Sequence, residues 1–113
     1  MSVYVILRKM TTMSVDTTLR NRVLEALLRI PKGKITTYAA LARNTGTHPR
    51  AAARILSSNK NPDKYPCFKV IHSDGRLGGF AFGVEDKVRR LEKDRVQVVG
   101  NRVPNFEEKL FEF

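Results

Sequence analysis

The chain has 113 residues, of which 42% are aliphatic or aromatic, so it can bury one modest core but hardly two. Its formal net charge is +10, from 21 Lys and Arg against 11 Asp and Glu, and so basic a balance favours a polyanionic partner such as nucleic acid. One cysteine excludes an internal disulfide, two distant histidines give no zinc-binding spacing, and no apolar run approaches the ~20 residues of a membrane-spanning helix.

We therefore expect an intracellular protein, cytoplasmic or nucleoid-associated, with no metal and no membrane partner. Residues 1–15 are predicted to be an N-terminal extension and residues 16–113 a single domain. Apolar residues at helical spacing predict a helix from Asp16, as its N-cap, to Ile30, and the sequence "PKGK" ends it. The apolar stripe of this helix consists of Leu19, Val23, Leu24, Leu27 and Leu28.

The next segment predicts a helix-turn-helix. A short strand near residues 34–38 leads into "YAALARNTG", a helix that Gly46 ends, and "RAAARILSSN" forms a second helix with Pro49 in its first turn. Any helical hairpin gives a similar pattern, but the charge favours DNA binding. Half of the net charge lies between residues 43 and 69, and Arg54 and Lys60 of this cluster are predicted DNA contacts.

The second half of the chain predicts short strands and one more helix. "FKVIH" predicts a strand over 68–72, "SDG" a turn and "RLGGFAFG" a glycine-rich return. Helical spacing resumes over 84–94, and the alternating tail is expected to cover the open edge of the core. The predicted fold class is mainly α with a few short strands, a winged-helix-like helix-turn-helix DNA-binding domain.

The one cysteine, Cys67, stands between Pro66 and Phe68. A lone cysteine is often only a small buried apolar side chain. Here Lys64 and Lys69 flank it, and nearby cations favour a thiolate over the neutral thiol, which is the condition for nucleophilic reactivity.

"PCFKVIHSDGRLGGF", preceded by "RAAARILSSNKNPDKY" and "GKITTYAALA", resembles the O6-alkylguanine-DNA alkyltransferases, or methylated-DNA-protein-cysteine methyltransferases, over about residues 19–103. The resemblance implies DNA repair in which an alkyl group passes from O6-alkylguanine in double-stranded DNA to the cysteine, after the base is flipped out of the duplex. Such a protein acts as a monomer and without a cofactor. It is consumed once per lesion, because a thioether has no easy route back to a thiol.

By position in the family's motifs, the resemblance also implies a role for individual residues. Cys67 is the implied alkyl acceptor, Arg50 enters the duplex where the flipped guanine was, and Tyr38 helps to turn the nucleotide out. Asn59 braces the active-site turn, and Asp94 stands where the family has a buried glutamate. The residues implied to form the substrate pocket are Tyr38, Phe68, Phe80 and Lys87.

The reactive turn departs from the family pattern. The family follows its cysteine with a histidine that passes a proton through water and is held by the glutamate. Phe68 occupies that place here and cannot accept a proton, and the glutamate is shortened to Asp94. Lys69 replaces an arginine of the family pattern, and Ala81 replaces a serine that often donates a hydrogen bond to the leaving oxygen. Phe82 lies in the glycine-rich segment that forms the entrance to the family's pocket.

Three interpretations follow. In the preferred one Cys67 still reacts, its thiolate stabilised by Lys64, Lys69, local dipoles or His72, although a strand register five residues on argues against direct contact with that histidine. In the second, the protein is similar to the alkyltransferase-like proteins, which bind alkylated DNA without repairing it. Those proteins lose the cysteine that this chain keeps. In the third, the domain is a non-catalytic DNA-binding module and Cys67 is structural.

Overall fold

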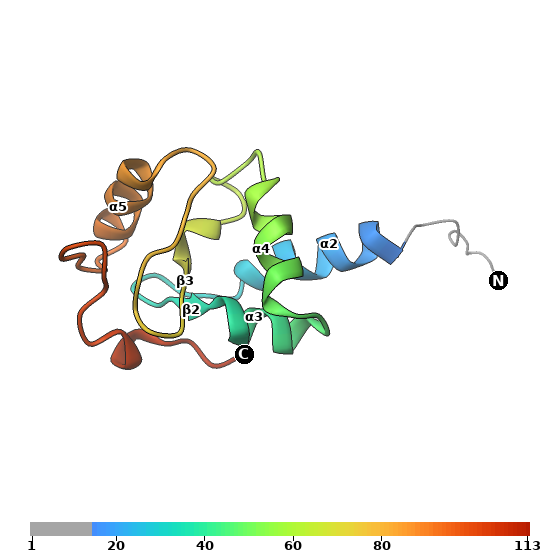
Figure 1. Cartoon of the computed structure of the whole chain (residues 1–113), viewed down its shortest axis with the longest axis horizontal. Coiled ribbons are helices and arrows are strands. Elements are labelled where there is room, and N and C mark those ends of the chain that lie inside the picture. Colours follow the sequence, from blue (N-terminus) through green and yellow to red (C-terminus); the bar gives the residue numbers. More distant parts are fainter. Residues whose placement is uncertain (1–14) are drawn as a thin grey trace.

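The structure is a computed structural model that describes residues 15–113, so the predicted extension, residues 1–15, lies outside it except for Val15. Within that range helices predominate, as predicted, and two short strands form the sheet (Figure 1). The elements in chain order are α2 (Val15–Leu27), β2 (Thr36–Thr37), α3 (Tyr38–Thr45), α4 (Pro49–Ser57), the 3-10 helix η1 (Cys67–Lys69), β3 (Val70–Ile71), α5 (Val84–Lys93) and the 3-10 helix η2 (Phe106–Lys109). No helix in the described range is both long and apolar enough to cross a membrane.

Helix α2 differs from the prediction at both ends. It begins one residue before Asp16, which therefore lies inside the first turn, and it ends at Leu27, before the predicted Ile30. The three residues after Leu27 bond to backbone carbonyls three residues earlier, at 3.1 to 3.2 Å, which tightens the last turn. Pro31 keeps the helix from continuing further, because a proline disfavours helical backbone in Ile30, the residue before it.

Helices α3 and α4 form the predicted helix-turn-helix, and side chains cap both of their N-termini. The Thr37 hydroxyl accepts a hydrogen bond from a first-turn N–H of α3 at 3.0 Å, and Gly46 ends that helix with a φ of 79°. At α4, His48 Nδ1 accepts from a first-turn N–H at 3.3 Å, and Pro49 is the first helical residue. The short connection between the helices is therefore held from both sides.

Strands β2 and β3 pair in parallel, with Thr36 opposite Val70. The predicted strand over 68–72 is wrong in its first half, because residues up to Lys69 form the tight turn η1. A hydrogen bond of 3.1 Å from Lys69 N to Pro66 O closes this turn. Side chains in η1 therefore do not alternate as they would along a strand.

The glycine-rich return does not pair with β3. A hydrogen bond from His72 N to Arg76 O, at 2.8 Å, closes the predicted turn, and Arg76 then pairs antiparallel with Arg102 in the tail. The predicted helix over 84–94 is confirmed as α5. Beyond it the tail crosses the molecule and places Leu110 beside Ile35 in a parallel bridge, so it covers the edge of the core as predicted.

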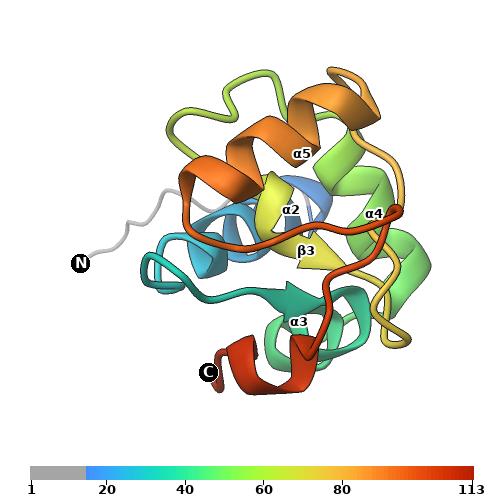
Figure 2. The same cartoon turned by 90° about the vertical axis from the view of Figure 1, so that its left-hand side faces the viewer.

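Two hydrophobic clusters lie on opposite sides of η1 and β3. Figure 2, seen from the α5 end, shows α5 in front of β3 and α2 behind it. The helical cluster consists of Val23, Leu24, Ala26, Leu27, Ile30, Leu41, Leu56, Cys67 and Val70. The α5 cluster consists of Ile35, Phe68, Ile71, Leu77, Leu91, Val96 and Val103. The adjacent residues Cys67 and Phe68 thus belong to different clusters, which anchors η1 from both sides.

Leu27 and Leu28 provide a matched test of the helical cluster, because Leu27 is fully buried whereas 53% of Leu28 is exposed. Leu27→Ala is expected to lower the free energy of unfolding by about 2–5 kcal/mol, since it leaves a cavity. Leu28→Ala is expected to change it by no more than about 0.5 kcal/mol. Urea unfolding followed by circular dichroism measures both, and equal losses would contradict the placement of Leu27 in the core.

Candidate functional site

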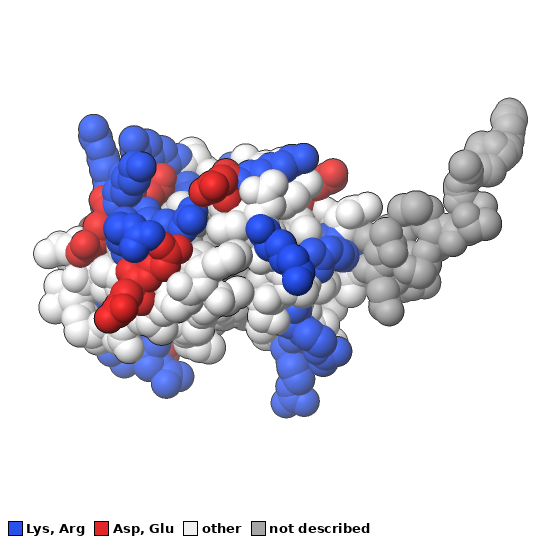
Figure 3. Space-filling view, turned by 90° about the horizontal axis from the view of Figure 1, so that it is seen from above, with Lys and Arg blue, Asp and Glu red and all other residues white. Residues whose placement is uncertain are grey.

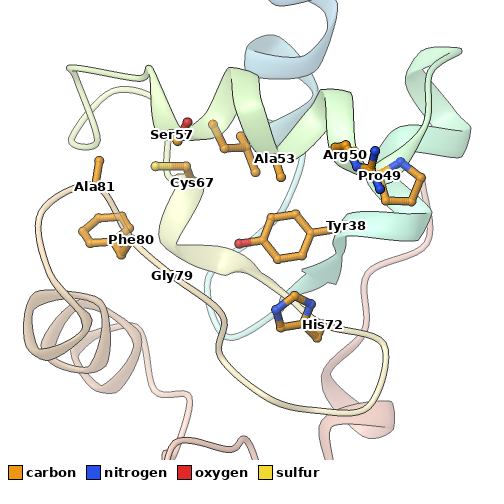
Figure 4. A pocket seen from close by; sticks show the side chains of 11 residues that line it. Tyr38, Pro49, Arg50, Ala53, Ser57, Cys67, His72, Gly79, Phe80 and Ala81 are labelled. Atoms are coloured by element: carbon orange, nitrogen blue, oxygen red, sulfur yellow. The ribbon is translucent and has the colours of Figure 1, made fainter.

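A cavity of about 520 Å³ opens between α4 and the loop around residue 80 (Figure 4). Its lining residues are Tyr38, Pro49, Arg50, Ala53, Leu56, Ser57, Cys67, His72, Gly79, Phe80 and Ala81. Four site residues predicted from the sequence meet here: Tyr38, Arg50, Cys67 and Phe80. Nowhere in the described chain do three or more His, Cys, Asp or Glu side chains gather as metal ligands.

One face of α4 forms the longest wall of the cavity. Arg50, Ala53 and Ser57 follow one another at spacings of three and four residues, which places them on the same side of the helix. Sequence reasoning named only Arg50, although this periodicity was the signal that could have found the others. In Figure 4 the exposed Arg50 lies at one end of the wall and Cys67 at the other.

Cys67 is held by backbone and side-chain contacts around η1. Its backbone N–H donates to Tyr65 O at 2.7 Å. Asn59 Nδ2 donates both to Tyr65 O at 2.9 Å and to Cys67 Sγ at 3.2 Å, and Asn59 Oδ1 accepts from Asn61 N at 3.0 Å. Asn59 is buried, so little water competes for its amide, and its hydrogen bond holds the sulfur from one side.

The surroundings of the thiol have opposing effects on the pKa of Cys67. Burial raises the pKa of Cys67, because a thiolate loses its hydration there. The hydrogen bond from Asn59 and the positive charges of Lys87 and Arg90 lower the same pKa, and burial prevails. The thiol is therefore less acidic than an exposed one unless a base assists it.

The two lysines that flank Cys67 in sequence do not supply the expected charge. Lys69 turns away: its Nζ lies 3.1 Å from Asp94 Oδ2 and donates to Pro31 O at 2.8 Å. Lys64 Nζ lies 5.1 Å above the ring of Tyr65. The interpretation that Lys64 and Lys69 stabilise the thiolate is corrected accordingly, since the positive charges that act on Cys67 are those of Lys87 and Arg90. For Lys69 the cause is the tight turn η1, which replaces the expected strand and redirects its side chain.

Asp94 and Phe68 also lie apart from the cavity. Besides its ion pair with Lys69, Asp94 Oδ2 accepts a hydrogen bond from Gly33 N at 3.1 Å. Phe68 packs in the α5 cluster, with 9% of its surface exposed, and does not line the cavity. The structure therefore brings neither the predicted acid nor the predicted pocket residue to the thiol.

Lys87 lies behind the cavity wall. Its side chain is fully buried, and its Nζ donates to the carbonyls of Val70 at 2.8 Å, Leu77 at 2.5 Å and Gly79 at 3.2 Å. Burial lowers the pKa of Lys87 to about 8, while the nearby Cys67 acts to raise it. By joining β3 to the loop at residues 77–79, Lys87 sets the position of that wall, although it does not line the cavity as the sequence predicted.

Tyr38 and His72 form the lower side of the cavity in Figure 4. Their ring centroids are 5.1 Å apart, with the planes tilted by 44°. Burial raises the pKa of Tyr38, and the proximity of Cys67 raises it further. Strand register argued against a place for His72 near the thiol, but the turn after β3 carries its side chain to the same cavity.

The surface around α4 is rich in cations. Arg43, Arg50, Arg54 and Lys60 are all exposed, and none of the salt bridges among residues 15–113 involves them. Figure 3 shows most of the acidic side chains at the left, at the α5 end, where they lie among basic ones, and others along the upper edge. Lys and Arg at the lower right of that view stand without acidic neighbours. This arrangement suits a polyanion that approaches α4.

Residues 18–96 match the family model of the 6-O-methylguanine DNA methyltransferase DNA-binding domain. The chain belongs to this family. A methylated-DNA-protein-cysteine methyltransferase of Methanothermobacter thermautotrophicus is 43% identical over 72% of this chain and 46% of its own length. The bifunctional methyltransferase/endonuclease of Picrophilus torridus is 42% identical over 66% of this chain and 26% of its own length. The chain thus spans less than half of either of these curated relatives.

Solved structures share the fold. The O6-methylguanine-DNA methyltransferase of Pyrococcus kodakaraensis is 33% identical, with a TM-score of 0.63 over 66% of this chain and 44% of that one. S. pombe Atl1, in complex with DNA containing O6-carboxymethylguanine, has a TM-score of 0.78 over 89% of this chain and 100% of its own. Its 24% identity indicates a common fold only.

Phe68→His tests whether a histidine next to Cys67 can work in this structure. Its imidazole would enter an apolar cluster, and the carboxylate that could hold it is already paired with Lys69. We expect a loss of about 1–3 kcal/mol in the free energy of unfolding and no faster reaction of Cys67 with iodoacetamide. Phe68→Leu, which keeps the site apolar, is the control. A faster thiol reaction in the histidine variant alone would contradict this expectation.

Proposed function

We propose that this protein repairs O6-alkylguanine in double-stranded DNA by transferring the alkyl group to Cys67 Sγ, once per protein molecule. The observation that carries the proposal is the shared cavity, which has the chain's single cysteine at one end and the exposed Arg50 of the helix-turn-helix at the other. A base that leaves a duplex bound against α4 can therefore reach the thiol inside one cavity.

Family membership supports this chemistry. The Methanothermobacter thermautotrophicus relative carries the name of a methylated-DNA-protein-cysteine methyltransferase, which supplies the reaction class. The Mycobacterium tuberculosis OGT, 32% identical with a TM-score of 0.64, was solved in complex with DNA and supports DNA as the partner. The cations around α4 supply the matching charge on this chain.

Residues on the helix-turn-helix expose the lesion. The O6 substituent of a stacked guanine lies inside the duplex, so the base has to leave the stack at a cost of a few kcal/mol. Arg50 fills the vacated space, and the partly exposed small residues Ala51 and Ala53 let α4 come close to the DNA groove. Tyr38 contacts the extruded nucleotide from the opposite side of the cavity.

The transfer itself is a direct displacement. The Cys67 thiolate attacks the alkyl carbon, the S–C bond forms as the C–O6 bond breaks, and the bonding electron pair stays on guanine O6. Guanine then takes up one proton, which replaces the proton that the thiol released. Asn59, which donates to Sγ at 3.2 Å, orients the sulfur and favours its anionic form. The thioether product has no thiol, so each molecule reacts once.

A second function, binding of alkylated DNA without transfer, is favoured by one observation. Burial raises the pKa of Cys67, while Phe68 and Asp94, the two positions of the family's proton relay, face other parts of the molecule. An unassisted thiol would react slowly at neutral pH. The transfer experiment below separates the two functions.

Cys67→Ser tests the acceptor. Wild type mixed with a duplex that contains O6-methylguanine is expected to gain the mass of one methylene group, because a methyl group replaces the thiol proton. Cys67→Ser should gain none and still bind the duplex, since Arg50 and the surrounding cations remain. Intact-protein mass spectrometry and fluorescence anisotropy measure the two properties. A wild type that prefers the modified duplex but gains no mass would favour the second function.

Arg50→Ala and Arg54→Ala separate two roles for cations on α4. Both side chains are exposed, but only Arg50 lines the cavity. We expect Arg54→Ala to weaken binding to damaged and undamaged DNA alike and to reduce the salt dependence, as the loss of a phosphate contact does. Arg50→Ala should slow transfer more than it weakens binding to undamaged duplex. Equal losses in both assays for Arg50→Ala would make it an ordinary phosphate contact.

A further inference from the structure

The thiol lacks a base in its own turn, yet the cavity contains one. His72 lines it together with Cys67, and imidazole is the side chain best suited to accept a proton near neutral pH. His72 is exposed, so burial in the core does not explain its place at this wall. Its ring packs against Tyr38 instead, at a centroid distance of 5.1 Å.

Gly78 brings the imidazole and the Tyr38 hydroxyl together. A Cβ on this residue would lie 3.0 Å from His72 Nε2 and 3.2 Å from Tyr38 Oη, and the φ of Gly78 is +75°. A residue with a side chain would crowd both polar atoms and strain the backbone. With glycine there, no side chain stands between the two atoms, and a water molecule can bridge them.

The Tyr38 hydroxyl also shares the cavity with the thiol. Tyr38 packs against the helical cluster that contains Cys67, and both residues line the cavity. In Figure 4 the hydroxyl points toward the side of the cavity where Cys67 and Phe80 lie. Burial and the proximity of Cys67 raise the pKa of Tyr38, so the hydroxyl stays protonated and can accept one hydrogen bond while it donates another.

We propose that His72 accepts the proton of Cys67 through the Tyr38 hydroxyl. His72 thus does, from the far side of the cavity, what a histidine directly after the cysteine does in the proteins that this sequence resembles. The inference rests on the proposed function, because it assigns the base for that alkyl transfer.

One proton moves from the thiol to the imidazole, and one proton later moves from the imidazolium to guanine. Cys67 gives its proton through water to Tyr38 Oη as Tyr38 gives its own through water to His72 Nε2, which leaves a thiolate and an imidazolium. The thiolate then takes the alkyl group, and the electron pair of the broken C–O6 bond stays on guanine. The imidazolium returns a proton to guanine by the same route or through solvent, so the histidine ends neutral.

Charged groups from several elements face this pair. Lys87 of α5 stands 5.9 Å from the centre of the Tyr38 ring, and Arg50 of α4 lines the same cavity. Both disfavour a positive imidazolium, whereas the thiolate formed in the same step and the phosphates of bound DNA favour it. In the turn after β3, the ion pair of Asp74 with Arg76 is internally compensated.

The test measures single-turnover transfer from O6-methylguanine duplex to the full chain, at saturating DNA and over a range of pH. His72→Gln keeps a polar side chain but loses the base, and His72→Phe keeps the aromatic packing on Tyr38. Both are expected to be about 100-fold slower than wild type at neutral pH, within the range of general base catalysis, and to regain rate in alkaline buffer. His48→Asn, which removes the other imidazole and keeps an N-cap, is the control and should match wild type.

Each outcome decides between distinct explanations. If His72→Phe transfers the methyl group at the wild-type rate, His72 is only a packing partner of Tyr38. If both variants lose transfer rate by the same factor at every pH, the effect is structural. Either result overturns the relay while the proposed function stands. A wild type that transfers no methyl group at any pH overturns both. DNA affinity measured in the Cys67→Ser background should be the same with and without His72→Gln.

Discussion

The tight turn at residues 66–69 is the constraint on which the rest of the site depends. It sends three successive side chains in three directions: Cys67 into the helical cluster beside the cavity, Phe68 into the α5 cluster, and Lys69 to the end of α2. Each of them is fixed by its own packing or hydrogen bonds. The sulfur therefore keeps one position relative to α4, and the cavity between them keeps its shape.

Positions 69 and 94 are physically coupled. A buried ammonium needs compensation, and Lys69 finds it in the carbonyls exposed by the early end of α2 and in the Asp94 carboxylate. That carboxylate also accepts from Gly33 N, so the pair joins the end of α2, the reactive turn and the end of α5. Because position 68 is phenylalanine, no imidazole next to Cys67 competes with Lys69 for the Asp94 carboxylate. The carboxylate can therefore serve as a structural partner of Lys69.

Charge near the thiol comes from another element. Burial raises the pKa of Cys67 and lowers that of Lys87 to about 8 for the same reason, since a poorly solvated environment disfavours both ions. Each ion, when present, favours the other. Lys87 thus combines two effects: it holds the wall at Gly79 through a carbonyl hydrogen bond and offsets part of the cost of a buried thiolate.

The sequence by itself determined that the helices exist, where α3 ends and α4 begins, and the family, because helical periodicity, Gly46 and Pro49 act over a few neighbouring residues. It also identified Tyr38, Arg50 and Cys67, which come together in the cavity as the motifs imply. Only the tertiary structure decided which way the side chains around the thiol point. A strand would have alternated them, whereas the 3-10 turn turned Lys69 away, and a turn closed by hydrogen bonds after β3 carried His72 to the cavity. Such directions depend on contacts between segments far apart in the chain, which local pattern and spacing do not encode.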